Sequence, residues 1–173
     1  PPQRCANAGV FRYEPRTQKF EVYVTYGFAN PHGHVFDRWG QDIVVDGTGA
    51  NPYHGPLFSG HLDFPQKHAR PPQVYQQRTR PCPGIEFLSS RHFPPEMQGI
   101  FLVPNVIGQQ GIFQMRVSDD GSSFQGKRLD ARYFLEDVLP HGAEACNYLL
   151  AVDVEMNTVG GYAISSWEQG YGD

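Results

Sequence analysis

The fold is decided by the stretch His34-Val35-Phe36-Asp37-Arg38-Trp39-Gly40-Gln41-Asp42-Ile43-Val44-Val45-Asp46. Its two apolar runs are typical of β-strands, and they flank the polar tetrapeptide 37–40. Asp at the first position of this tetrapeptide and Gly at the last are residues that a type I turn prefers. The stretch therefore predicts a β-hairpin.

Similar short runs recur on both sides of this hairpin. Phe20, Val22 and Val24 alternate with Glu21, Tyr23 and Thr25, which predicts a strand with one buried face. Further strands are predicted at Phe58–Asp63, Ile85–Ser89, Ile100–Val106 and Gly111–Val117, and the polar stretch from Gln66 to Pro83 predicts a long surface loop. Repeated short hairpins with Gly and aromatic residues are typical of β-propeller blades, although a β-sandwich has the same periodicity.

The pattern changes after about residue 125. Asp130 is placed to cap a helix whose apolar residues fall at helical spacing up to Leu139, and Pro140 would end it. Strands are predicted again from Tyr148 to Val154 and from Tyr162 to Trp167. We therefore expect a mainly β fold with two parts, a partial propeller over residues 1–125 and a short α+β appendage over residues 126–173, with the boundary between 121 and 128.

Composition excludes several functions. The net charge is -4 and Lys and Arg form no cluster, so nucleic acid and anionic membranes are not expected partners. No apolar run approaches the ~20 residues of a membrane span. Because the chain begins with Pro1-Pro2, without Met or a leader, either a signal has been removed or the chain starts inside a longer protein, and we favour the second. A Cys5–Cys82 bridge and three free thiols, Cys146 included, are both compatible with the cysteine spacing.

Three ordered motifs carry a family resemblance, and they are the segments 27–40, 82–94 and 105–111. Over about residues 9–124 the chain resembles the propeller of membrane-bound dehydrogenases from planctomycetes and related bacteria. Those proteins are similar to quinone-dependent glucose and sorbosone dehydrogenases, which implies oxidation of a sugar or alcohol with pyrroloquinoline quinone and calcium. The resemblance implies an exported or periplasmic protein.

The resemblance implies a cofactor face formed by Asn30, His32 and His34. In the wider family an Arg-Asn-Pro-Gln segment approaches the quinone, and here it is matched by Ala29-Asn30-Pro31-His32. The arginine that would pair with a quinone carboxylate is therefore absent, and its loss is not a conservative change. This favours a non-catalytic binding module as an alternative.

Histidines in Gly- and Pro-rich loops are candidate bases, because imidazole titrates near neutral pH. We predict His32, His54 and His61 as catalytic candidates and surface residues as the alternative; no metal set is evident. Trp39 and Tyr53 are candidates to stack on a sugar ring, or else packing residues between blades. The segment from Glu86 to His92 contains Ser, His and an acid but lacks a nucleophile elbow, so an ordinary loop explains it better.

A second resemblance covers about residues 126–173. The segments 126–135, 147–157 and 161–173 resemble the N-terminal β-grasp segment of glutamine synthetase family ligases, which are cytoplasmic. In that family this segment lends residues to the active site of a neighbouring subunit, and Ser165, Ser166 and Trp167 match the loop that does so. An ATP-dependent ligase fragment is thus the alternative to the dehydrogenase, and a partial propeller implies open sheet edges that favour self-association.

Overall fold

The structure is a computed structural model that describes residues 2–47, 49, 51–56, 59–61, 66, 67, 69–76, 84–105, 111–129 and 151–166. Within these ranges the chain forms four antiparallel sheets and one short 3-10 helix, η1 (Pro95–Met97). The mainly β fold is therefore confirmed. The sheets form an open stack, and no closed propeller is seen among the described residues.

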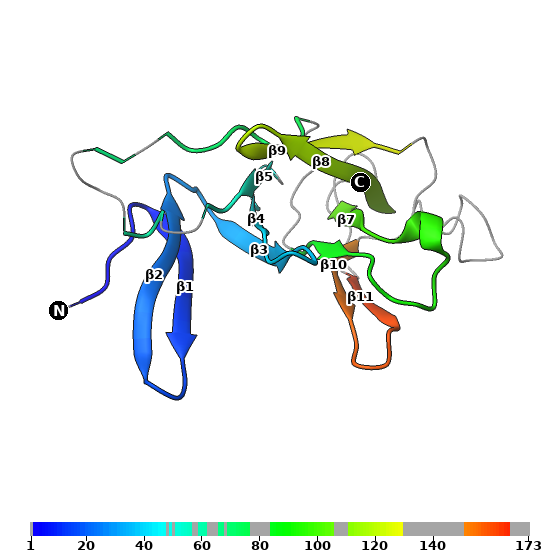
Figure 1. The fold of residues 1–173 in the computed structure, drawn as a ribbon, viewed down its shortest axis with the longest axis horizontal. Helices are drawn as coiled ribbons and strands as arrows, with labels where there is room; N and C mark the ends of the chain where they lie inside the picture. Colours follow the sequence, from blue (N-terminus) through cyan, green and yellow to red (C-terminus); the bar gives the residue numbers. More distant parts are fainter. Residues whose placement is uncertain are drawn as a thin grey trace.

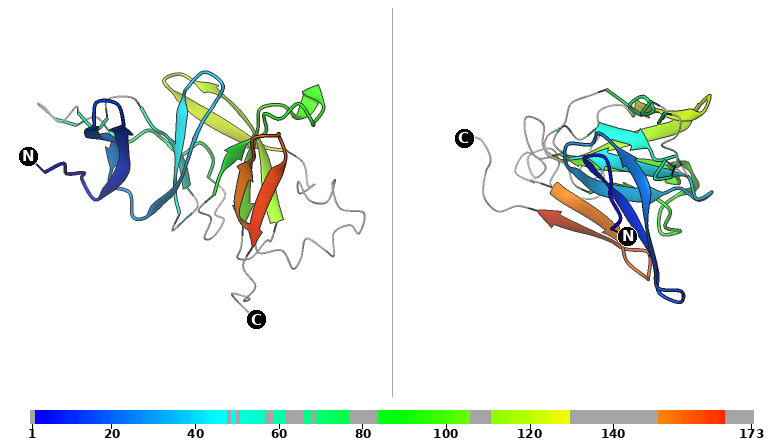
Figure 2. Two further views of the ribbon diagram at one scale, coloured as in Figure 1. Left: turned by 90° about the horizontal axis from the view of Figure 1, so that it is seen from below. Right: turned by 90° about the vertical axis from the view of Figure 1, so that its left-hand side faces the viewer.

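The sheets follow one another in chain order along the long axis of the molecule (Figures 1 and 2). The first pairs β1 (Ala8–Glu14) with β2 (Lys19–Tyr26), and the second has the order β3 (Pro31–Phe36), β4 (Asp42–Asp46), β5 (Asn51–His54). The third contains β6 (Glu86–Phe87), β7 (Ile100–Asn105), β8 (Gly111–Asp120) and β9 (Ser123–Arg128). The last pairs β10 (Ala151–Met156) with β11 (Tyr162–Ser166).

Successive side chains of the central strands β4 and β7 face different neighbouring sheets, so the hydrophobic core consists of separate clusters between the sheets. In β4, Val44 packs toward the first sheet, and Ile43 and Val45 pack toward the third. In β7, Phe101 and Val103 share the core of Ile43 and Val45, whereas Ile100 and Leu102 face β10. Both faces of these strands are buried, which explains why their sequences are continuous apolar runs.

The predicted hairpin of residues 34–46 is confirmed. Phe36 pairs with Asp42, and Gly40 closes the turn with a 3.1 Å hydrogen bond from its N–H to the carbonyl of Asp37. The Asp37 carboxylate accepts N–H groups from Trp39 and Gln41 at 2.8 and 2.9 Å, so it shapes the turn as expected of an Asp at this position. Gly40 has φ +80°, a conformation that glycine adopts without strain.

Two predictions for the middle of the chain need correction. In the predicted strand 58–63, the described residues Ser59–His61 form a turn. In the predicted surface loop 66–83, Val74 and Tyr75 are buried. The Val74 N–H donates to the carbonyl of Pro52 on β5, and its carbonyl accepts the N–H of Gly126 on β9 at 2.6 Å. This segment therefore joins the second and third sheets.

The predicted helix over residues 131–139 lies outside the described residues. The predicted strands 148–154 and 162–167 correspond to β10 and β11. The predicted domain boundary falls within β9, which pairs with β8 from Ser123 to Arg128. Cys5 is a free, half-buried thiol, and Cys82 and Cys146 lie outside the described residues.

Candidate functional site

The residues predicted to face a quinone lie in the loop that precedes β3 and at its start. The Asp46 carboxylate accepts the N–H groups of Ala29 and Asn30, each at 2.8 Å, and the Asn30 carbonyl accepts the N–H of Gly47 at 2.8 Å. The side chains of Asn30 and His32 are exposed. Asp46 thus orders the loop by accepting hydrogen bonds from its backbone, so its role in the described structure is structural.

His34 is held by a buried carboxylate. Its Nε2 lies 3.0 Å from Oδ2 of Asp42, whose side chain is 2% exposed. A carboxylate only accepts hydrogen bonds, so Nε2 carries the proton and donates it. Among the described residues no hydrogen bond to Nδ1 is found, and Phe36 contacts the imidazole edge-on at 4.7 Å between centroids. This pair is an oriented imidazole of the kind used in acid–base sites.

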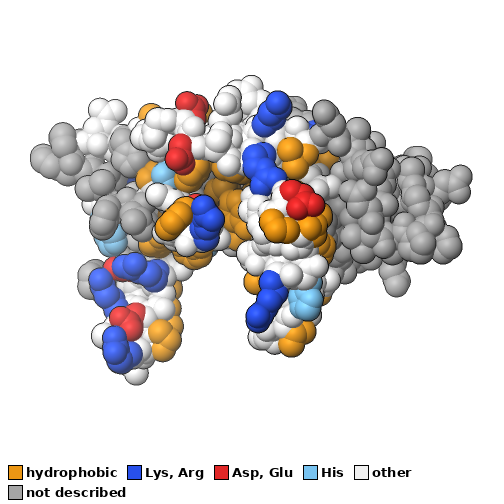
Figure 3. Space-filling model, turned by 45° about the vertical axis from the view of Figure 1, so that its right-hand side comes forward, with side chains coloured by type: hydrophobic (Ala, Val, Ile, Leu, Met, Phe, Trp, Pro, Cys, Tyr) orange, Lys and Arg blue, Asp and Glu red, His pale blue; other side chains and the backbone are white. Residues whose placement is uncertain are grey.

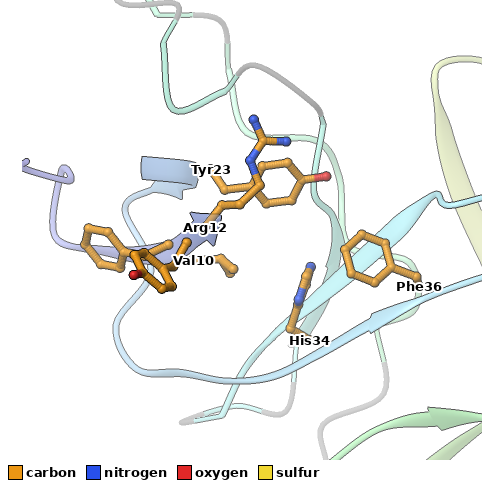
Figure 4. A pocket seen from close by; sticks show the side chains of 7 residues that line it. Val10, Arg12, Tyr23, His34 and Phe36 are labelled. Atoms are coloured by element: carbon orange, nitrogen blue, oxygen red, sulfur yellow. The ribbon is translucent and has the colours of Figure 1, made fainter. Parts of the chain in front are cut away.

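A pocket of about 430 Å³ lies between the first two sheets, and the His34 imidazole forms part of its wall (Figure 4). Seven residues line it: Val10, Phe11, Arg12, Tyr13, Tyr23, His34 and Phe36. Its walls are mostly aromatic, and Phe11, Tyr13 and Phe36 are 43%, 55% and 49% exposed. The pKa of the Tyr23 phenol is raised, mainly by burial and secondly by the charge of Asp42. Tyr23 is therefore a neutral polar residue of the pocket wall.

Beside this pocket the Glu21 carboxylate is surrounded by cations. Lys19 Nζ lies 2.6 Å from Oε2, Arg12 Nε donates to Oε1 at 2.7 Å, and His61 Nε2 is 3.7 Å from Oε2. The hydrogen bonds from Lys19 and then Arg12 lower the pKa of Glu21 to about 2. The antiparallel register of β1 and β2 places Arg12 directly opposite Glu21, and the sequence pattern alone did not reveal this cluster.

The other two catalytic candidates lie elsewhere. His54 Nδ1 is 3.2 Å from the carbonyl of Ser122, and its ring contacts Phe124 at 4.8 Å between centroids. His61, half exposed, lies beside Glu21. The predicted histidines therefore have different partners, and the described structure does not gather them in one site. In the described residues no group of three or more His, Cys, Asp or Glu side chains could hold a metal ion.

The two aromatic candidates differ in exposure. Trp39 is 76% exposed at the β3–β4 turn, and the Arg38 guanidinium lies over its ring at 4.8 Å. It borders a groove of about 780 Å³ that runs to the third sheet, and Figure 3 shows hydrophobic side chains gathered in a central hollow of the molecule. Tyr53 is only 3% exposed, and its hydroxyl accepts a 3.0 Å hydrogen bond from Gln73. Tyr53 belongs to the core.

The residues of the segment 86–92 have structural partners. The Glu86 carboxylate accepts the N–H of Phe87 at 2.8 Å, and the Ser90 hydroxyl accepts the N–H of His92 at 3.2 Å. His92 Nε2 donates to the carbonyl of Val159 at 2.7 Å. This segment thus forms a turn that contacts the β10–β11 hairpin, in agreement with the loop interpretation.

The β10–β11 hairpin packs on the third sheet through one apolar face. Val154 is fully buried among Leu88, Ile100, Leu102 and Ile112, and Tyr162 packs at the margin of the same cluster. The ring of Tyr162 also contacts Phe93 edge-on at 5.7 Å between centroids. Ser165 and Ser166 are the last residues of β11, and Trp167 lies outside the described residues.

Comparison with known proteins gives one informative match. A 49-residue segment of the chain is 71% identical to the gamma-glutamylethanolamide synthetase GlnA4 of Streptomyces coelicolor, and it covers 28% of this chain and 11% of that relative. No protein-family model and no solved structure matches the chain. The resemblance of one segment to glutamine synthetase family ligases is thereby confirmed, and nothing found supports the dehydrogenase propeller. The described part of the chain contains no helix long and apolar enough to span a membrane.

Proposed function

We propose that this chain belongs to an ATP-dependent ligase of the glutamine synthetase type and supplies the ligase's N-terminal β-grasp segment through residues 126–173. The observation that carries the proposal is the 71% identity over 49 residues to a gamma-glutamylethanolamide synthetase. The predicted ligase-like segment is of nearly the same length. By analogy with that relative, the parent enzyme forms an amide on the γ-carboxyl group of glutamate.

The structure supports a contributing role for this segment more than a self-contained site. The β10–β11 hairpin is a two-stranded ribbon with one apolar face, and such a hairpin needs a partner surface for stability. Here the apolar face is covered by the third sheet, through Val154 and Tyr162. Ser165 and Ser166, which match the loop that reaches a neighbouring subunit in the ligase family, are the last residues of β11.

A segment graft tests the proposal. The corresponding segment of the Streptomyces coelicolor relative is replaced by residues 126–173, and formation of γ-glutamylethanolamide is measured in the assembled chimera. We expect activity within tenfold of the unmodified relative, and Trp167→Ala in the graft is expected to lower it further. A chimera that assembles normally but has lost all activity would overturn the proposal.

The preceding residues support a second, structural proposal. The sheets are stacked face to face in chain order, and each shares a hydrophobic core with the next. Successive blades of a β-propeller pack in this manner. We propose that residues 1–125 are part of such an array, in which β1 pairs only with β2 among the residues that the structure describes. A quinone-dependent dehydrogenase stays a prediction for this part, without a supporting match.

A further inference from the structure

The pocket between the first two sheets is a concave site lined by exposed aromatic side chains and by two basic residues. Three of its aromatic side chains, Phe11, Tyr13 and Phe36, are about half exposed although they are large and apolar. Exposed apolar side chains that cluster around a concavity mark a binding site more often than isolated ones. Its volume of about 430 Å³ lies in the range of small-molecule sites.

The polar groups of this pocket are cationic or neutral. Arg12 and His34 are its two basic lining residues, and no carboxylate is among the described residues that line it. Figure 4 shows Arg12, Tyr23 and His34 on the two sides of the space between β1–β2 and β3. The anionic partners of these groups, Asp42 for His34 and Glu21 for Arg12, are not among the residues that line the pocket.

Arg12 shares its carboxylate partner with a second cation. Glu21 is shared by Arg12, Lys19 and the neighbouring His61, so a single carboxylate faces two permanent cations. The Arg12 guanidinium also lies over the Tyr23 ring at 5.3 Å, which holds it at the pocket wall. A guanidinium offers five N–H donors, so its ion pair with Glu21 leaves donors for a second anion.

From this arrangement we propose that the pocket binds a small aromatic carboxylate. The ring of the ligand packs between Phe11 and Phe36, and its carboxylate accepts hydrogen bonds from Arg12 and from the Nδ1–H of His34 in the imidazolium form, whose Nε2–H is held by Asp42. Asp42 acts as a positioning residue, because its buried carboxylate fixes the orientation of His34. A ligand with a cationic group would be repelled by Arg12, and a neutral ring would lose the ionic hydrogen bonds. This site is independent of the proposed ligase function.

The test is a titration of the full chain with benzoate, followed by backbone amide chemical shifts in NMR. We expect saturable shifts at residues 10–13, 23 and 34–36, and binding at least about tenfold tighter than for benzamide, which lacks the charge, or acetate, which lacks the ring. His34→Gln is expected to weaken benzoate binding at least about fivefold. The matched variant His54→Gln, whose histidine lies outside the pocket, should leave it unchanged.

A second pair of variants distinguishes loss of binding from loss of folding. Phe36 and Trp39 are both exposed aromatic residues near the same hairpin turn, but only Phe36 lines this pocket. Phe36→Ala should weaken benzoate binding and Trp39→Ala should not, while the amide spectra of both stay native. Equal affinity for benzoate and benzamide, shifts that do not saturate, or equal effects of the paired variants would each overturn the proposal.

Discussion

The hydroxyl of Tyr162 donates a 3.1 Å hydrogen bond to the carbonyl oxygen of Phe87, and thereby joins the last hairpin to the first strand of the four-stranded sheet. The Tyr162 hydroxyl oxygen also accepts the N–H of Ser89 at 2.9 Å. Phe87 and Tyr162 belong to the two parts of the chain that the sequence predicts, residues 1–125 and 126–173. The contact therefore makes the two parts of the chain dependent on each other.

Tyr162→Phe removes one hydroxyl and leaves two backbone groups without their partner. We expect the free energy of unfolding to fall by about 0.5–1.5 kcal/mol, the net contribution of an ordinary hydrogen bond, because Ser89 is exposed and its N–H can bond to water instead. Chemical denaturation measures the change, with Tyr13→Phe as the control because that side chain is 55% exposed. Equal stability of the two variants would show that the Tyr162 hydroxyl is not held by the sheet.

Leu102→Ala opens a cavity beneath the β10–β11 hairpin. Leu102 is fully buried and shares its core with Val154, so we expect a loss of about 2–5 kcal/mol in unfolding free energy. Hydrogen exchange should also accelerate at the amides of 151–156 and 162–166. Unchanged exchange in the hairpin, together with faster exchange in β7 and β8, would mean that the two parts fold separately.

Gly160→Ala tests how closely the hairpin turn approaches the third sheet. Gly160 has φ +88°, and a Cβ there would lie 2.7 Å from both His92 Cδ2 and Ser90 Oγ. Gly121 has φ +63° with open space around it, so Gly121→Ala is the control that introduces backbone strain without a steric clash. This strain costs about 1–2 kcal/mol. We expect Gly160→Ala to lower the thermal midpoint further than Gly121→Ala. Equal shifts would contradict the close approach.

Acid should weaken the first hairpin through Glu21. The pKa of this carboxyl is lowered from 4.5 to about 2 by Lys19 and Arg12, so the folded state releases its proton more readily than the unfolded state does. Its contribution to stability is present above pH 4.5 and is lost as the pH falls from 4.5 toward 2. The stability difference between the native chain and Glu21→Gln should therefore shrink between pH 6 and pH 3. The control Glu14→Gln changes an exposed carboxyl and should show no such trend.

Local pattern predicted the strands β2 and β7, but the single buried face predicted for β2 is wrong. Glu21, Tyr23 and Thr25 are buried as well as Val22 and Val24, because both faces of β2 are covered, and Phe20 is 49% exposed. Local pattern missed β5, because Pro52 argues against a strand, and β9, whose polar residues face outward. Val74 was assigned to a surface loop because its neighbours are polar, yet it is buried between two sheets. Its burial depends on contacts with residues about twenty and fifty positions away, which local periodicity cannot reveal.

The candidate site was likewise predictable only where its contacts are local in the sequence. The hairpin register places His34 diagonally across from Asp42 on one face, so their pairing was implicit in the predicted turn, although we did not derive it. Arg12 and Tyr23 reach the same pocket from another sheet, and only the packing of the two sheets brings them together. The partners of His54 and His61 likewise come from distant segments.

The two backbone hydrogen bonds of Val74 have a practical consequence for engineering the chain. Exposed polar stretches are the usual choice for affinity tags, protease sites or inserted domains, because their backbones bond to water. The segment 69–76 looks suitable by composition, yet each Val74 bond ends on a different sheet. An insertion there would disconnect β5 from β9, whereas the exposed turn at Gly121 would accept the same insertion at little cost.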